Sequence, residues 1–150
     1  MMKPPPPEKV AEALSAVADG RVRMFDGRAI VTSSDRKKEY TVSWNGDVYT
    51  SSDSATYWQG YAGYPVIAVL LLQGRLSFND ETAARFSGIN WTELNARYKR
   101  NYAAALAAVM EGIKDRGGDT GAISAELDAL YARLNSLPLT IKRGAVKPRK

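Results

Sequence analysis

Apolar residues change from helical to alternating spacing early in this chain. Residues 8–19 carry apolar side chains three and four positions apart, which predicts a first helix. From residue 22 the period becomes two, and the pairs Asp26-Gly27 and Asn45-Gly46 favour tight turns between short strands. This pattern predicts a small antiparallel sheet of three or four strands over residues 22–51.

Helical spacing returns after an aromatic-rich loop at residues 52–64. The run 66–73 is apolar on nearly every face, which is typical of a helix at the centre of a fold. A short helix is expected next, followed by a long helix over 91–115 and a last helix over 120–136, with the last two forming an αα-hairpin within residues 90–136. The sequence therefore predicts an α+β fold with an N-terminal helix, a small sheet, an apolar central helix and C-terminal helices.

The two ends of the chain differ in composition from its middle. Residues 1–7 contain four consecutive prolines, which favour an extended arm. Residues 8–137 are interpreted as a single globular domain, and residues 138–150 as a basic tail. The first residues lack the apolar core of a signal peptide, and no apolar run reaches bilayer length, so we expect a cytoplasmic protein.

The excess of positive charge is confined to the tail. The whole chain has 21 Lys and Arg residues against 16 Asp and Glu residues. Five of the cations lie in the last nine residues, so the rest of the chain is neutral. Basic residues separated by Gly and Pro can follow a phosphate backbone and release its counterions, which makes the tail a candidate binding arm. The five residues are Lys142, Arg143, Lys147, Arg149 and Lys150.

Most conventional catalytic groups are missing from the sequence. The chain has no cysteine and no histidine, which excludes a disulfide framework, a cysteine nucleophile, a zinc finger and a histidine base. The remaining candidate carboxylates do not form a convincing pair or metal set and are interpreted as turn and cap residues, namely Asp47, Asp53, Asp80 and Glu81. We therefore predict a protein without enzymatic activity and without a cofactor.

Two segments beside the aromatic loop carry a family resemblance. YTSSD at residues 49–53 ends the predicted sheet, and GYPVIAVLL at residues 63–71 opens the central helix. With the preceding helix and strands, they resemble the SWIM domain family, whose small zinc modules carry CSCPD in the returning strand and a segment like CKHIIAVLL in the helix. The resemblance covers about residues 11–76.

The resemblance predicts a member of this family without its metal. The four ligand positions are occupied by Tyr49, Ser51, Gly63 and Pro65, none of which binds zinc as such a site requires. Aromatic residues are expected to fill the place of the metal as a packed plug, namely Trp44, Tyr49, Tyr57, Trp58, Tyr61 and Tyr64. The alternative is a stacking platform for bases formed by Tyr57, Trp58, Tyr61 and Tyr64.

Two function hypotheses follow from the tail and the resemblance. The first is a non-catalytic protein that binds nucleic acid, with structured RNA favoured over duplex DNA and ribosome association as one example. Further candidate phosphate contacts are a turn with Arg36, Lys37 and Lys38 and a helix face with Arg97, Lys99 and Arg100, although each of these residues also suits a solvated surface. The second is a SWIM-like protein–protein adaptor, for example for a recombinase-type ATPase or another DNA-repair complex. In this hypothesis segment 103–110, which consists mostly of small residues, docks a partner helix.

Overall fold

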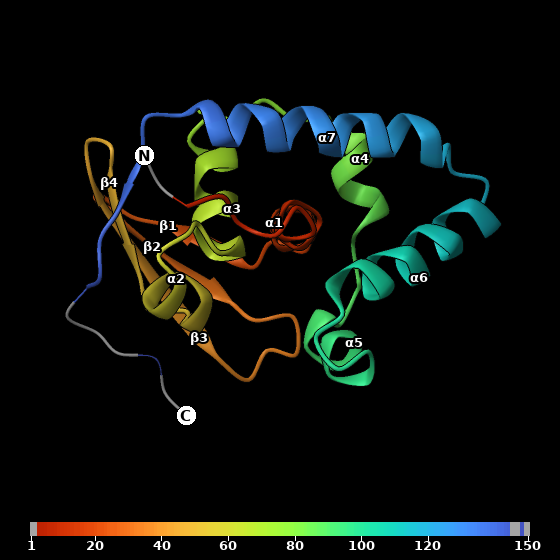
Figure 1. The fold of residues 1–150 in the computed structure, drawn as a ribbon, viewed down its shortest axis with the longest axis horizontal. Coiled ribbons are helices and arrows are strands. Elements are labelled where there is room, and N and C mark those ends of the chain that lie inside the picture. Colours follow the sequence, from red (N-terminus) through yellow and green to blue (C-terminus); the bar gives the residue numbers. More distant parts are fainter. Residues whose placement is uncertain (1–2, 145–147, 149–150) are drawn as a thin grey trace.

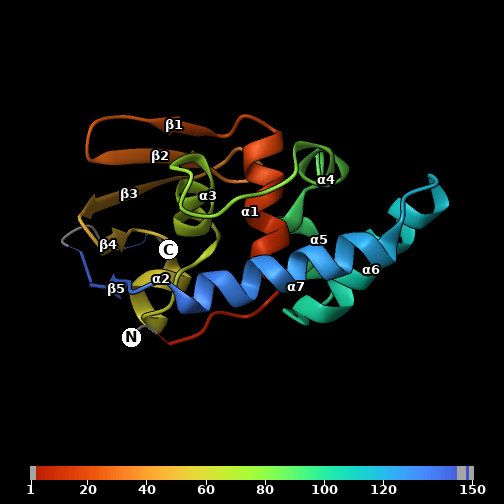
Figure 2. The same ribbon diagram turned by 90° about the horizontal axis from the view of Figure 1, so that it is seen from above.

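The computed structural model describes residues 3–144 and residue 148, and it contains a mixed sheet with helices on one side. The strand order is β1-β2-β3-β4-β5, which can be followed along one side of the molecule in Figure 2. Strands β1 to β4 pair antiparallel, and β5 pairs parallel to β4. The strands are β1 (Val22–Met24), β2 (Arg28–Thr32), β3 (Glu39–Asn45), β4 (Val48–Ser51) and β5 (Thr140–Ile141).

The helices occupy the first segment, the middle and most of the second half of the chain. They are α1 (Lys9–Ala18), α2 (Ser54–Gln59), α3 (Tyr64–Leu72), α4 (Asp80–Arg85), α5 (Trp91–Arg97), α6 (Tyr102–Asp115) and α7 (Thr120–Ser136). The α+β class predicted from the sequence is confirmed. Within residues 3–144 no helix has the length and apolar character needed to cross a bilayer.

Helices α1 and α3 form the centre of the molecule. Helix α3 packs against α1 and against the sheet, and α1 also packs against α4 and α7. Figure 1 shows α1 end-on, with the sheet on one side, helices α4, α5 and α6 on the other, and α7 running across the top. Helix α3 is buried from Pro65 to Leu71 because its apolar surface has no polar face to present to water. One apolar core therefore joins the sheet to the C-terminal helices.

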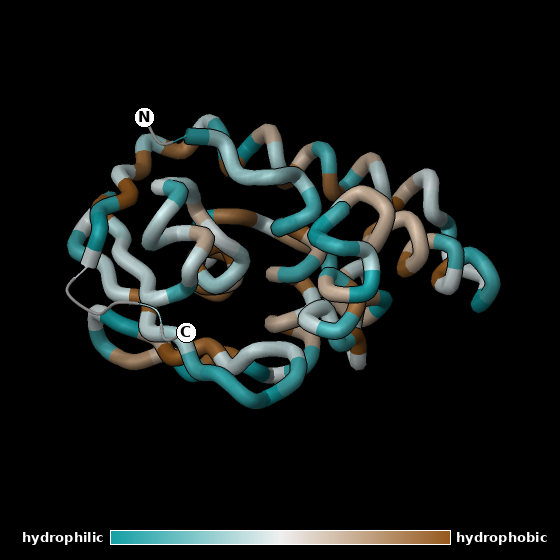
Figure 3. Tube along the Cα trace, turned by 60° about the horizontal axis from the view of Figure 1, so that its bottom comes forward, coloured by the Kyte–Doolittle hydropathy of each residue, from teal (hydrophilic) through white to brown (hydrophobic). Residues whose placement is uncertain are grey.

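Helix α7 buries the row of apolar residues that was predicted for it. Ile123, Leu127, Leu130 and Leu134 are its buried residues, and they recur at helical spacing. The alternation of hydrophobic and hydrophilic residues along this helix can be followed in Figure 3. The stripe turns α7 toward α6 and α1, so the predicted helical hairpin is present as α6 and α7.

The predicted long helix over 91–115 is wrong, because the chain breaks between α5 and α6. Lys99 and Arg100 both have left-handed backbone conformations, with φ of 54° and 65°. The Arg100 amide donates to the Asn95 carbonyl at 2.7 Å, which closes the end of α5. Asn101 then caps α6 by accepting from the Ala104 amide.

Two other expectations are corrected. The sheet has five strands and is mixed, because β5 adds parallel to the edge of β4. The loop over 52–64 contains helix α2, which begins after the N-cap Asp53. The proline arm, for which an extended conformation was predicted, packs against α7, since Pro5 is buried and its carbonyl accepts a hydrogen bond from the Tyr131 hydroxyl at 2.7 Å.

Candidate functional site

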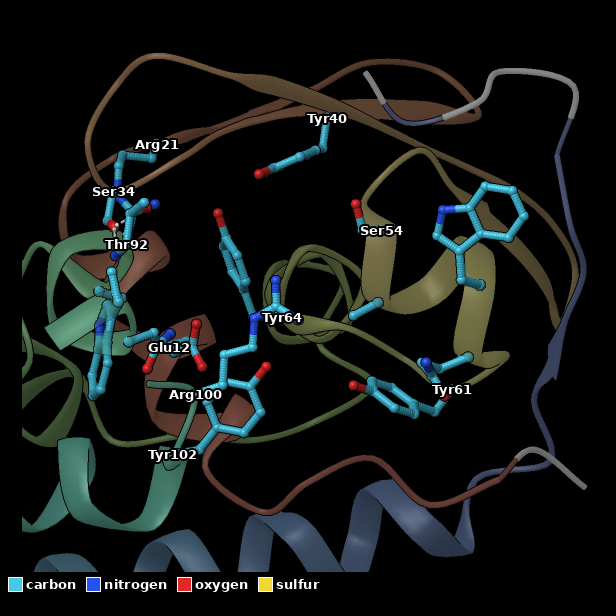
Figure 4. Close-up of a pocket in the computed structure, with 16 residues that line it drawn as sticks. Glu12, Arg21, Ser34, Tyr40, Ser54, Tyr61, Tyr64, Thr92, Arg100 and Tyr102 are labelled. Atoms are coloured by element: carbon cyan, nitrogen blue, oxygen red, sulfur yellow. Dashed lines mark hydrogen bonds between the residues drawn. The ribbon is translucent and has the colours of Figure 1, made fainter. Parts of the chain in front are cut away.

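A cleft of about 660 Å³ lies where the sheet side of the molecule meets α5. Its residues come from segments far apart in the sequence, and Figure 4 shows their side chains facing a common space. The lining residues are Glu12, Arg21, Ser34, Tyr40, Ser54, Ala55, Trp58, Gln59, Tyr61, Tyr64, Trp91, Thr92, Asn95, Ala96, Arg100 and Tyr102. Aromatic rings and hydrogen-bonding groups thus share one cavity, which is typical of a ligand site.

The tyrosines of the cleft are neutral hydrogen-bonding groups. Tyr40 and Tyr64 meet edge to face, with ring centroids 6.3 Å apart. Figure 4 shows their hydroxyls pointing toward the same space, on the side of Arg21. Burial raises the pKa of the hydroxyls of Tyr40, Tyr61 and Tyr64 above the ordinary value, so each stays protonated at neutral pH.

Glu12 brings a buried carboxylate to the cleft from the first turn of α1. Its side chain is held between Lys9 on the same helix and Asn95 on α5. The Glu12 Oε2 atom lies 3.3 Å from Lys9 Nζ, which makes an ion pair, but the two groups are not aligned for a hydrogen bond. Lys9 also lies over the Tyr102 ring, 4.1 Å from its centroid. Burial raises the pKa of Glu12, and the Lys9 charge opposes that rise.

Arg21 is the buried cation of the cleft. Its Nη1 donates to the Thr32 carbonyl at 2.7 Å, and its Nε lies 3.5 Å from Asp19 Oδ2. These contacts fix the guanidinium just after the end of α1 and leave Nε and Nη2 without a hydrogen-bond partner.

Unused hydrogen-bonding capacity is concentrated at this cleft. Among the residues that the structure describes, the buried side-chain atoms without a hydrogen-bond partner are Glu12 Oε2, Arg21 Nε, Arg21 Nη2, Trp91 Nε1 and Asn95 Oδ1. All belong to residues that line the cleft. Buried polar groups in proteins are nearly always paired, so a cluster of such atoms in one cavity points to a polar ligand.

The mouth of the cleft is polar and carries cations. The Ser34 hydroxyl accepts from the Thr92 amide at 3.1 Å, which ties the β2–β3 turn to the start of α5. That turn continues into Arg36, Lys37 and Lys38, which are all exposed. Arg100 is exposed as well and lines the cleft from the left-handed corner before α6.

The other end of the cleft is formed by Trp58, which also contacts the basic tail. The Arg143 guanidinium carbon lies 5.0 Å from the Tyr57 ring centroid and 5.1 Å from that of Trp58. Arg143 Nε also donates to the Tyr57 carbonyl at 3.3 Å. The first part of the predicted basic tail lies against the sheet, because β5 holds residues 140–141 and the Lys142 amide donates to the Tyr49 carbonyl.

A chain of buried hydrogen bonds positions α2 and α3 along the cleft. Ser51 Oγ donates to Asp53 Oδ1, and the amide and hydroxyl of Thr56 both donate to Asp53 Oδ2 at 3.0 Å. The Gly63 amide then donates to Thr56 Oγ1 at 2.9 Å. This chain, called the Asp53 clip below, joins the end of β4 to the start of α3.

The Asp53 clip involves two of the positions that the SWIM resemblance assigns to zinc ligands. Ser51 and Gly63 are its two ends. Among the described residues, no group of three or more Asp or Glu side chains is placed to hold a metal ion. The expected aromatic plug is wrong as a single cluster, because Trp44 stacks on Tyr49 while Trp58 is 53% exposed.

The structure brings together some of the predicted site residues and separates others. Trp58, Tyr61 and Tyr64 line the cleft. Tyr57 does not line it, and its ring contacts the Arg143 guanidinium. Lys147, Arg149 and Lys150 lie outside the described residues, and Lys142 is exposed beside β5.

Sequence reasoning missed the polar residues at the inner end of the cleft. Glu12, Arg21 and Asn95 were not among the predicted site residues. The available signal was Glu12, which is a carboxylate inside a helix made mostly of small apolar residues.

The protein thus has an α+β fold with one cleft that is lined by tyrosines and has cationic side chains at its edge. Residues 2–140 match the family described as "Uncharacterised conserved protein UCP014422", so the chain belongs to that family. No curated protein matches the sequence, and no solved structure matches the fold.

Proposed function

We propose that this protein is a non-catalytic RNA-binding protein that holds an unpaired segment of a structured RNA across the cleft. The observation that carries the proposal is Trp58, which is 53% exposed and lies between the cleft and the stacked Arg143. An exposed aromatic face beside a guanidinium is the arrangement on which single-stranded bases stack.

Cations on both sides of the cleft support the proposal. Arg100 and the exposed Arg36–Lys38 turn stand at one end, and Arg143 stands at the other. Among the described residues, none of these side chains takes part in an ion pair, so each is available to phosphate. A strand crossing the cleft would meet cations where its backbone enters and leaves.

The lining of the cleft favours single-stranded RNA over a duplex. Aromatic faces can stack only on bases that are not already stacked in a helix. The hydroxyls of Ser34, Ser54 and Thr92 offer partners to a ribose 2′-hydroxyl, which DNA lacks. A cytoplasmic location goes with this proposal.

The first experiment tests the stacking face. Trp58→Ala is expected to weaken binding of an unstructured RNA oligonucleotide by about 1–3 kcal/mol, measured by fluorescence anisotropy. Phe25→Ala is the matched control, because Phe25 is also exposed but lies beside Arg28 and outside the cleft. Equal affinities for the two variants would contradict the proposal.

The second experiment tests the cations through salt dependence. Arg100→Gln and Arg143→Gln are each expected to reduce the slope of log K against log salt by about 0.7. Arg97→Gln is the control, because Arg97 pairs with Glu93 at 2.7 Å and does not line the cleft. Replacing Lys142, Lys147, Arg149 and Lys150 together by Gln should lower the slope further. An RNA affinity that does not change with salt concentration would rule out this function.

An apolar groove supports a protein adaptor as the second candidate function. Exposed Ala103 and Ala107 line it with Leu106 and Met110 of α6, opposite Leu127 of α7. The groove has a volume of about 300 Å³ and suits a partner helix. An adaptor would retain a protein partner after nuclease treatment, and Ala107→Glu would release that partner while leaving RNA affinity unchanged.

A further inference from the structure

The cleft contains both hydrogen-bond acceptors and hydrogen-bond donors that have no hydrogen-bond partner. The acceptors without a hydrogen-bond partner are Glu12 Oε2, which is ion-paired with Lys9, and Asn95 Oδ1, and the donors are on Arg21 and Trp91. Glu12 is 4% exposed and Arg21 is 3% exposed, so both are built into the protein and are not free surface groups. The tyrosine rings in the lining favour a flat ligand, and the unpaired polar atoms favour one that carries both hydrogen-bond donors and hydrogen-bond acceptors.

Guanine fits these requirements better than the other RNA bases. Its N1–H and N2–H₂ groups are adjacent donors, and a carboxylate accepts two parallel N–H bonds. Its O6 and N7 atoms are adjacent acceptors that a guanidinium can reach together. Adenine, cytosine and uracil each lack a pair of adjacent donors on the Watson–Crick edge. A carboxylate and a guanidinium in one cleft therefore discriminate in favour of guanine.

The remainder of the cleft suits the sugar and phosphate of the same nucleotide. Tyr40, Tyr61, Tyr64 and Tyr102 supply aromatic walls. Arg100 lies at the mouth, where a 5′-phosphate attached to an inserted base would emerge. The cleft volume of about 660 Å³ is within the range of sites that hold a whole small ligand.

We propose that the cleft binds one guanine nucleotide of the RNA, with Glu12 and Arg21 reading the base and Arg100 contacting its phosphate. This inference rests on the proposed function and adds base specificity to it. Asn95 and Trp91 provide the remaining polar contacts to the base.

The test uses the full chain and the free nucleotides GMP, IMP and AMP in isothermal titration calorimetry. GMP is expected to bind, and IMP, which lacks only the 2-amino group, is expected to bind about ten- to a hundredfold more weakly. AMP should bind no better than IMP. This comparison needs no variant, so a folding defect cannot affect it. Equal affinity for GMP, IMP and AMP would overturn the inference.

Variants separate the base contact from the phosphate contact. Glu12→Gln should remove the preference for GMP over IMP. Glu8→Gln should retain this preference, because Glu8 is the N-cap residue of α1 and does not line the cleft. Arg100→Gln should weaken GMP binding and leave guanosine binding unchanged. A preference for GMP that survives Glu12→Gln in a protein with an unchanged near-UV circular dichroism spectrum would also overturn the inference.

The two proposals fail in different ways. Salt-dependent RNA binding without any base preference would refute the guanine site and keep the RNA-binding function. Glu12-dependent GMP binding without affinity for RNA oligonucleotides would do the reverse.

Discussion

Gly63 is the residue whose replacement tests the Asp53 clip. A Cβ at this position would overlap Asp53 Oδ2 and lie 2.7 Å from Thr56 Oγ1. The φ of Gly63 is −69°, so its role is close approach and not an unusual backbone conformation. The clip leaves no space for a side chain at the start of α3.

Gly63→Ala is therefore expected to destabilise the protein by about 1–3 kcal/mol, because the clip must open to admit the methyl group. Urea unfolding measures the change. Gly121→Ala is the control, since Gly121 lies exposed in α7 with only an ordinary contact to Asp119, and alanine there should raise stability by about 0.5–1 kcal/mol. A Gly63→Ala protein as stable as the wild type would show that the clip is loose.

The buried Glu12 side chain is expected to make the free energy of unfolding of the protein depend on pH. Burial raises its pKa in the folded state, so between the unfolded and folded pKa values the folded chain binds more protons than the unfolded chain. The stability from this group is complete below the unfolded pKa of about 4.3 and is lost as pH rises through the folded value.

The measurement is urea unfolding of the wild type and Glu12→Gln across acidic to neutral pH. The stability of the wild type relative to the variant should fall as pH rises. The groups facing Glu12 are Lys9 and Glu8 on its own side and Asn95 from α5, and all remain in the variant. Parallel stability curves would mean that Glu12 titrates as an exposed carboxylate.

At the scale of elements, the corner between α5 and α6 has a strained backbone and also contributes a residue to the cleft. Lys99 and Arg100 are non-glycine residues in the left-handed region, at about 1 kcal/mol or more each. Only Arg100 lines the cleft. The strained corner thus places a cation at the mouth.

Replacing either residue by glycine separates these two effects. Lys99→Gly and Arg100→Gly should each leave stability unchanged or raise it by up to about 1 kcal/mol, because relief of strain offsets the greater freedom of the unfolded chain. RNA affinity should fall for Arg100→Gly alone, measured by fluorescence anisotropy. A similar loss of affinity in both variants would assign the effect to the shape of the corner and not to the Arg100 charge.

Elements with strong local patterns were predictable from the sequence. The alternation around Val42, the apolar run of α3 and the stripe of α7 each define an element by themselves. The break after α5 was not predicted, because no glycine or proline marks it and two non-glycine residues adopt the left-handed conformation there. Strand β5 was missed because two residues carry no periodic signal.

The cleft could be predicted only in part. Trp58, Tyr61 and Tyr64 were singled out with Tyr57 because they crowd one segment, as part of an expected packed plug or, alternatively, of an aromatic platform. Glu12, Arg21 and Asn95 are separated by long stretches of sequence, and only the fold brings α1 and α5 together. A lone carboxylate in an apolar helix is a local inconsistency, and here it marks the polar end of the cleft.

At the scale of the whole molecule, the first part of the basic tail is joined to the cleft. Strand β5 carries the chain from α7 back to the sheet, and Arg143 then stacks on the outer side of Trp58. Figure 1 shows this segment passing beside α2. Arg143 of the predicted tail and Trp58 of the alternative aromatic platform are therefore parts of one surface beside the cleft.

The central claim is that RNA enters the cleft. Photocrosslinking of the full chain to an unstructured RNA that contains guanine, followed by mass spectrometry of the crosslinked peptides, tests it most directly. We expect crosslinks to Trp58 and to the cleft tyrosines Tyr61, Tyr64 and Tyr102. Crosslinks confined to residues 142–150, or none at all, would contradict it.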